Sequence, residues 1–177
     1  NSKTIAHLNI AYCRIKHYGA SFLASSFAVN KSLRQIILTG AQVKQSSKRL
    51  AFSLMRLPNL TMLNVGDAQI GTEGMEPFAR MMESIPALVS LDLFANSIGD
   101  AGAIGIGNAL TVNQCLTSLC LKRNNIGNEG LSAISVALVA NKKLRILDVG
   151  GNCIGDEGIE ILATVLSTRS NLTELDL

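Results

Sequence analysis

Residues 116–130 read LTSLCLKRNNIGNEG, and this stretch decides the fold because the chain repeats it. The same pattern returns as LTMLNVGDAQIGTEG at 60–74, LVSLDLFANSIGDAG at 88–102 and LRILDVGGNCIGDEG at 144–158. Weaker copies begin near residues 5 and 33, and a partial copy begins near 172, so that successive units start 27 or 28 residues apart. Self-similarity at a fixed period of this length predicts a solenoid in which each unit packs on its neighbours.

The first half of each unit has the pattern of a short strand. Leu116, Leu119 and Leu121 approach the period-two alternation of a strand with one buried face. Three residues after the last of these comes Asn124, and Ala68 holds the same place two units earlier. An Asn side chain can satisfy backbone groups of the connecting loop, which Ala cannot do.

The second half of each unit has helical spacing. A large apolar residue is followed by a small one and, four positions on, by another large one, as in Ile134, Ser135 and Leu138. We interpret the small residues, including Gly105 and Gly107, as places where a helix packs closely on the sheet beneath it. The helices are expected to begin near 73, 101, 129 and 157, with Thr72, Asp100, Asn128 and Asp156 as N-caps.

The unit L-x-x-L-x-L-x-x-N-x-I-G-x-x-G, followed by a helix, resembles the leucine-rich repeat, and in particular its ribonuclease-inhibitor-like subclass. The resemblance covers the whole chain, as six repeats starting near 5, 33, 60, 88, 116 and 144 and a partial one at 172. It implies a single α/β solenoid domain over residues 1–177, shaped as a horseshoe with a parallel β-sheet on the concave face and α-helices on the convex face. Members of the subclass are mostly intracellular and mostly bind other proteins, so the resemblance implies a cytoplasmic protein-binding scaffold.

Both ends of the chain lie close to a strand. The chain begins four residues before one predicted strand and ends inside another. Because terminal repeats normally need a polar cap over the exposed apolar layer, we expect a fragment of a longer protein. Further repeats or domains of the same chain are then expected at one or both ends.

Composition argues against several classes of function. Lys and Arg number 16 against 13 Asp and Glu, and a formal charge of +3 is too small to indicate nucleic acid or a membrane as partner. No apolar run reaches the ~18 residues that a membrane span needs. The four cysteines are scattered without C-x-x-C spacing, which indicates a reducing compartment and no disulfide framework.

The residues that usually do chemistry form no enzyme motif. The G-x-x-G pairs recur at each helix start, which favours a structural role over phosphate binding. His7 lies on a predicted strand and His17 at a helix entry, so a shared metal site is not expected. Asp92, Asp148 and Asp176 share one strand position, but other residue types interrupt the row, and we interpret it as a solvated concave face. We therefore expect no catalytic residues, no cofactor and no metal.

The candidate binding surface is the strand face turned away from the helices, formed by the third, fifth and seventh residues of each unit with the eighth on the rim. Phe94 is the most informative residue there, because exposed aromatic side chains are typical interface anchors. Ile37, Met62 and Ile146 are expected to extend its apolar patch diagonally, beside the positive charge of residues 122–123. The candidate partner-binding residues are Tyr12, Ile37, Met62, Asp67, Asp92, Phe94, Lys122, Arg123, Ile146 and Asp148.

An alternative for Phe94 is a local role, in which it covers Ile146 or Cys120 or touches another part of a longer chain.

Three functions follow from the sequence. The first is a non-catalytic scaffold that binds another protein through the concave face. The second is a Ran-type GTPase-activating protein. The resemblance would place its activity on the edges and loops of the repeats, although Ala41 and Ala68 replace polar residues at two of these loop positions. The third is a ligand-sensing or structural segment of a larger receptor or cytoskeletal protein.

Overall fold

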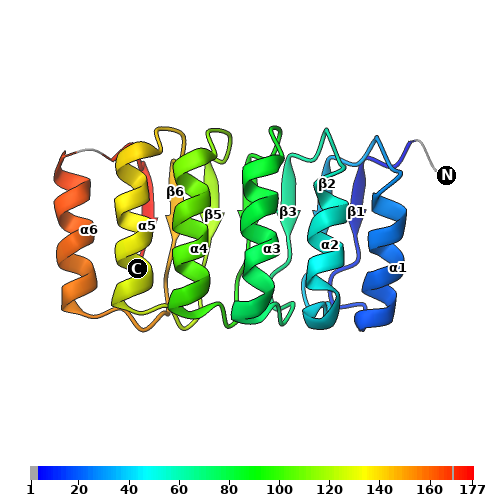
Figure 1. Ribbon diagram of the computed structural model, residues 1–177, viewed down its shortest axis with the longest axis horizontal. Helices are drawn as coiled ribbons and strands as arrows, with labels where there is room; N and C mark the ends of the chain where they lie inside the picture. The colour runs from blue at the N-terminus through cyan, green and yellow to red at the C-terminus, as the bar shows by residue number, and fades with distance from the viewer. Residues whose placement is uncertain (1–3, 169) are drawn as a thin grey trace.

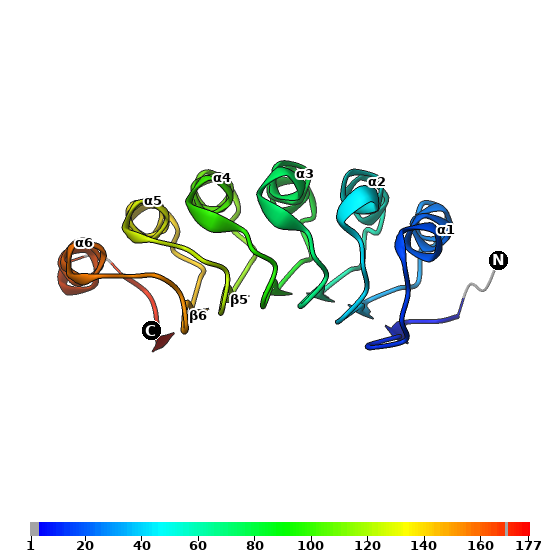
Figure 2. The ribbon, with the colours of Figure 1, turned by 90° about the horizontal axis from the view of Figure 1, so that it is seen from below.

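The computed structural model describes residues 4–168 and 170–177, and these form two curved layers (Figures 1 and 2). One layer is a seven-stranded parallel sheet in the order β1-β2-β3-β4-β5-β6-β7. Its strands are β1 His7–Asn9, β2 Gln35–Ile37, β3 Met62–Asn64, β4 Ser90–Asp92, β5 Ser118–Cys120, β6 Ile146–Asp148 and β7 Glu174–Asp176. The other layer holds α1 His17–Phe27, α2 Ser47–Leu54 with the preceding 3-10 turn Lys44–Ser46, α3 Gly71–Ser84, α4 Gly99–Val112, α5 Asn128–Ala140 and α6 Asp156–Thr168.

The predicted α/β solenoid is confirmed. Figure 2 shows the helices along the outer arc and the strands along the inner one. Each strand pairs with the next in the register of the repeat, so that Ser90 lies beside Ser118 and Ser118 beside Ile146. Equivalent residues of successive units therefore form rows that run across the sheet.

The core lies between the two layers and is built by the leucine pattern. Leu119, in the middle of β5, is fully buried against the helices, whereas Ser118 and Cys120 on the other face are half-buried. Leu116 and Leu121, which flank the strand, are also fully buried. The expected alternation of strand faces is thus the observed one.

The helical stripe is buried wherever a helix has a neighbour on both sides. Ile134 and Leu138 of α5 have exposed fractions of 0% and 2%. At the ends of the row, Leu23 of α1 is half-buried and Leu166 of α6 is 38% exposed. The outermost helices pack against one neighbour only, which leaves part of their stripe uncovered.

Our interpretation of the two glycines of α4 as contacts with the sheet is wrong, because both face neighbouring helices. A Cβ added to Gly107 would lie 2.8 Å from the carbonyl oxygen of Ala133 in α5. A Cβ on Gly105 would lie 3.9 Å from the Cβ of Ala79 in α3. The absence of a side chain at Gly107 therefore lets two helix backbones approach closely.

The predicted N-caps also act differently from expectation. The helices begin at Gly71, Gly99, Asn128 and Asp156, one or two residues earlier than predicted. Asp100 consequently lies inside the first turn of α4, and its Oδ1 accepts hydrogen bonds from the amides of Gly127 (2.6 Å) and Gly130 (2.9 Å) at the start of α5. The Oδ1 atom of Asn128 likewise accepts the amide of Gly155, just before α6, at 2.8 Å. These side chains cap the helix of the following repeat rather than their own.

A row of asparagines, buried at positions 96 and 124 and half-buried at 152, connects the loops that follow the strands. The Nδ2 group of Asn124 donates to the carbonyls of Leu93 and Leu121, both at 2.9 Å, and its Oδ1 accepts from the amide of Asn96 at 2.7 Å. The Nδ2 group of Asn152 in turn donates to the carbonyl of Leu121, and its Oδ1 accepts from the amide of Asn124. Each Asn thus satisfies backbone groups of its own loop, as the sequence predicted, and also groups of the repeat before it, which the sequence did not predict.

Candidate functional site

The concave surface is formed by half-buried strand residues and more exposed residues on the rim. Tyr12 and Asp67, on the rim, are exposed and have positive φ angles of 55° and 49°. Arg123 is exposed with a φ of 54° and lies at the equivalent position of a later repeat. The turn after each strand projects these side chains from the edge of the sheet, where a partner can contact them.

Polar residues at the fifth position of the unit hold the strand ends in place. Asp92 accepts the amide of Phe94 at 2.9 Å, and its second oxygen accepts the Nδ2 group of Asn64 at 2.7 Å. Asp148 accepts the amide of Gly150 at 2.8 Å. The carboxylates of Asp92 and Asp148 therefore help to fix the backbone where the strands end.

Cys120 lies in the same row between two of these carboxylates. Its Sγ is 3.8 Å from an oxygen of Asp148, and Asp92 is beside it on the adjacent strand. Burial is the largest influence on the pKa of this thiol, and with the two negative charges it raises the pKa to about 12. The thiol therefore stays protonated at neutral pH and is a poor nucleophile.

Phe94 forms the centre of the candidate surface, but it is half-buried rather than fully exposed. Its Cβ lies over Gly66, where an added Cβ would be 3.4 Å away. On its other side the guanidinium carbon of Arg123 lies 5.9 Å from the ring centroid, which is a cation–π distance. Nearby, Lys122 and Asp148 form an ion pair at 3.8 Å. An aromatic ring with a guanidinium over it thus lies on the concave face.

The other apolar candidates do not adjoin this ring. Met62 and Ile146 lie in the row of third residues with the serines of β4 and β5 between them. Ile37 lies in the fifth-position row, separated from β4 by the polar Asn64. The register therefore places Phe94, Ile37, Met62 and Ile146 as separate apolar points, and the expected diagonal patch is not continuous.

The described part of the chain was compared with what a metal site and a membrane-spanning helix require. His7 lies on β1, whereas His17 begins α1 and packs against the ring of Tyr18 with centroids 4.0 Å apart. Across residues 4–168 and 170–177, no three His, Cys, Asp or Glu side chains gather as metal ligands would. None of the helices described is both long enough and apolar enough to cross a membrane.

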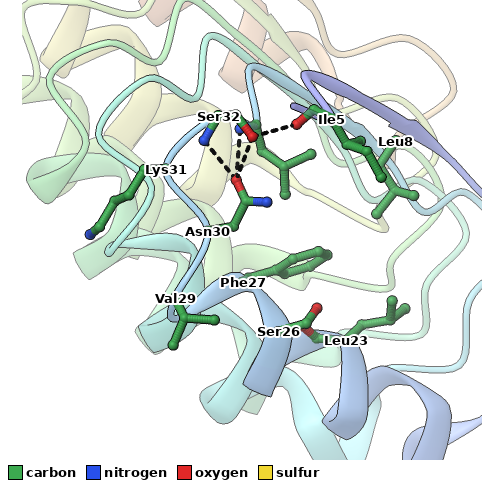
Figure 3. Close-up of a pocket in the computed structure, with 10 residues that line it drawn as sticks. Ile5, Leu8, Leu23, Ser26, Phe27, Val29, Asn30, Lys31 and Ser32 are labelled. Carbon is green, nitrogen blue, oxygen red and sulfur yellow. Dashed lines mark hydrogen bonds between the residues drawn. The ribbon is translucent and has the colours of Figure 1, made fainter. Parts of the chain in front are cut away.

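A groove of about 710 Å³ opens at the N-terminal end of the solenoid, between β1 and α1 (Figure 3). Leu8, Leu23 and Phe27 form its apolar wall, and Asn30 lies at its edge. The Oδ1 atom of Asn30 accepts the amide of Ser32 at 2.8 Å and so orders the turn beside the groove. Among the described residues the first repeat has a neighbour on one side only, and this leaves the groove open.

Comparison with known proteins identifies the family. The leucine-rich repeat profile matches residues 56–79, 86–107, 112–135 and 140–163, which together make up more than half of the chain. The chain belongs to the leucine-rich repeat family. No sequence among the curated proteins is similar enough to match it.

Two solved structures are similar over most of their length. One is the actin-binding site 2 of leiomodin-1, with 25% identity, a TM-score of 0.66, and coverage of 76% of this chain and 78% of that chain. The other is the tropomodulin C-terminal domain of Caenorhabditis elegans, with 12% identity, a TM-score of 0.69, and coverage of 84% and 91% respectively. The second likeness concerns the fold alone.

Proposed function

We propose that this chain is a non-catalytic scaffold that binds a partner protein through its concave face, centred on Phe94 and Arg123. The observation that carries the proposal is the half-buried ring under the guanidinium of Arg123, beside the Lys122–Asp148 ion pair. Aromatic and arginine side chains are the commonest anchors of protein interfaces. Asp92, at the end of β4 and two residues before Phe94, adds a carboxylate to this centre.

The remaining candidate residues form the periphery of the proposed surface. They are Tyr12, Ile37, Met62, Asp67 and Ile146. Tyr12 has an exposed fraction of 68% and Ile146 of 36%, so both are available to a partner. A partner that covers several repeats would contact the separate apolar points one by one, as extended solenoid surfaces allow.

A non-catalytic role agrees with the local chemistry. The carboxylates of Asp92 and Asp148 accept backbone amides of their own turns, and burial keeps the thiol of Cys120 protonated. Free thiols at four separate positions fit a reducing compartment, and we therefore also propose a cytoplasmic location.

The proposal is tested by affinity capture with a variant of the centre. The bait carries Phe94→Ala and Arg123→Glu, and its control carries Val139→Ala and Lys143→Glu, exposed residues on and just after α5. We expect the central variant to lose a specific protein that the wild type and the control both retain. Identical captures by all three would exclude the concave centre as the binding surface.

Stability measurements show whether Phe94 belongs to the surface or to the core. Leu119→Ala removes a fully buried side chain and is expected to cost about 2–5 kcal/mol. Phe94→Ala is expected to cost clearly less, because the ring is partly exposed and its contacts lie on one side of the sheet. Equal losses in thermal melts would assign Phe94 to the core.

Actin is the first partner to test. The structure 25% identical to this chain is described as an actin-binding site, and it aligns over 76% of the chain. Co-sedimentation with filamentous actin, using the wild type and the Phe94→Ala/Arg123→Glu variant, gives a direct answer. Pelleting that the variant loses would support both actin and the concave face, whereas no pelleting of the wild type would exclude filamentous actin.

A Ran-type GTPase activator is the second candidate, and it would use the loops after the strands. In the early repeats these loops carry Ala41 and Ala68, which are 3% and 0% exposed and offer no polar group to a nucleotide. A GTPase assay with Ran is expected to show no stimulation. A role as a structural or ligand-sensing segment would instead leave every captured partner unchanged by concave substitutions.

A further inference from the structure

The small net charge of the chain conceals a strong separation of charge along it. Residues 1–66 contain nine of the 16 Lys and Arg residues and no Asp or Glu, whereas residues 67–177 contain all 13 acidic residues and seven basic ones. The first segment forms the first two repeats and β3. Glu76–Arg80 and Lys122–Asp148, the ion pairs found among the described residues, both lie beyond it. One end of the solenoid is therefore strongly basic, and such asymmetry points to an anionic partner.

Basic and apolar groups meet in a groove between α1 and α2 on the convex side. This groove has a volume of about 420 Å³ and is lined by Ser25 and Ala28 from the α1 side and by Arg49, Phe52, Ser53 and Arg56 from the α2 side. Arg49 donates to Ser25 Oγ at 2.9 Å across it. The ring of Phe52 is 43% exposed between the two arginines. The groove thus offers an apolar contact flanked by two cations.

The neighbouring face of α1 continues the apolar surface. Tyr18 and Phe22 have exposed fractions of 72% and 77%, and they lie two turns and one turn before Ser25, respectively, on the same helical face. Aromatic side chains this exposed contribute nothing to the core of the described chain. Their position next to the groove makes them a ridge against which a bound segment can pack.

We propose that the α1–α2 groove is a docking surface for an acidic segment of another protein, in which carboxylates pair with Arg49 and Arg56 and an apolar side chain packs on Phe52. A guanidinium binds a carboxylate through two parallel hydrogen bonds, which suits this partner. Arg49 lies in the first turn of α2 and Arg56 in the turn that follows Leu54, so the two cations stand at opposite ends of a helix of eight residues, which is about 12 Å long and equals three or four residues of an extended peptide. The surface lies opposite the concave face, so the proposal is independent of the proposed function.

The geometry favours a peptide over a nucleic acid or a bilayer. The groove lining holds two cations and one aromatic ring, whereas a nucleic-acid strand is bound along a basic track several nucleotides long with an aromatic ring for each of several bases. The helices follow an outward-curving arc, so that a flat membrane would touch few of these side chains at once (Figure 2). A peptide can follow the groove between the helices and contact Phe52 and both arginines together.

The test is selection from a random 12-residue peptide library displayed on phage. The wild-type chain is the target, and Arg49→Glu/Arg56→Glu is the counter-target. A second variant, Lys31→Glu/Arg34→Glu, changes the net charge equally at exposed positions outside this groove. Thermal melts first establish that both variants fold like the wild type.

We expect the enriched peptides to carry Asp or Glu three or four residues apart with an apolar residue between them. A fluorescent synthetic copy of one such peptide should bind the groove variant at least tenfold more weakly than the wild type. The Lys31→Glu/Arg34→Glu variant should lose less than threefold. Phe52→Ala should also weaken binding, which separates a seated peptide from a diffuse charge attraction.

Several results would overturn the proposal. Enriched peptides without acidic residues, or equal losses in the two charge variants, would show that the groove is not the binding site. A 20-nucleotide oligo(dT) or phosphatidylserine vesicles that bind more tightly than the peptide, and lose this binding in the groove variant, would assign the surface to a nucleic acid or a bilayer. A dimer in sedimentation that Arg49→Glu/Arg56→Glu abolishes would assign it to a second copy of the chain.

Discussion

The two glycines of α4 allow one substitution to be compared in two environments. Ala is better than Gly inside a helix by about 1 kcal/mol, so Gly105→Ala and Gly107→Ala gain the same intrinsic amount. At Gly105 the new methyl would meet the Cβ of Ala79 at 3.9 Å, an ordinary contact, and the gain is retained. At Gly107 it would lie 2.8 Å from the carbonyl oxygen of Ala133 and 3.0 Å from its carbon, so the backbones of α4 and α5 must separate.

Overpacking of this kind typically costs about 1–3 kcal/mol. We therefore expect Gly105→Ala to stabilise the protein by about 0.5–1 kcal/mol and Gly107→Ala to be destabilising by up to about 2 kcal/mol. Urea unfolding followed by circular dichroism at 222 nm measures both against the wild type. If Gly107→Ala proves as stable as Gly105→Ala, close approach of the helix backbones does not limit this position, and the reasoning is refuted.

Three further predictions concern the asparagine row, exchange rates and the buried thiol. Asn124→Ala leaves the buried amide of Asn96 without an acceptor. It also removes the bonds to the carbonyls of Leu93 and Leu121, although each carbonyl keeps a donor from a neighbouring Asn of the row. The free energy of unfolding should therefore fall by about 2–5 kcal/mol. Asn108→Ala, on the exposed face of α4, should cost almost nothing in the same unfolding experiment, and a similar loss in both would contradict the role of the row. Amides in residues 30–80 should exchange faster than those in 88–166 by mass spectrometry, because the Asn position holds Ala at both early places, and equal or greater protection in the first range would refute this. The folded state holds the proton of Cys120 up to about pH 12, while the unfolded thiol loses it near pH 9.0, so the free energy of unfolding should fall between these values. Serine at this position should remove that part of the pH dependence, and an unchanged slope would show that the thiol is not its source.

Much of the fold could be predicted because it depends on local periodicity. The spacing of Leu116, Leu119 and Leu121 determines which face of a strand is buried, whatever the neighbouring repeat contains. The role of Asn124 in its own loop was predictable for a similar reason, since its bond to the carbonyl of Leu121 spans a fixed offset of three residues. A regular repeat turns a local pattern into a global arrangement.

Contacts between repeats were harder to predict, because they depend on distances that the sequence does not contain. Asp100 has the composition and place of an ordinary N-cap, yet its carboxylate reaches the next helix. Gly107 likewise gives no local sign that the backbone of α5 lies beside it. In both cases the spacing of neighbouring helices decides the role of the residue.

The candidate site was predicted in part. The strand pattern placed Phe94 and Arg123 on the concave side, but their stacking requires the turn after β5 to direct the guanidinium back over the ring. The α1–α2 groove was missed because the net charge was considered for the whole chain. The signal was present in the sequence, since no acidic residue precedes Asp67.

The asparagine row also determines how the solenoid responds to bending. Through the loops of repeats three to six, buried amide side chains link each unit to the next, so relative rotation of two units must break hydrogen bonds. Between the first two repeats no such link exists among the described residues, because the position holds Cys13 and Ala41. Backbone and serine hydrogen bonds still join those two repeats. We therefore expect a change of curvature to require the fewest broken side-chain links at the basic end.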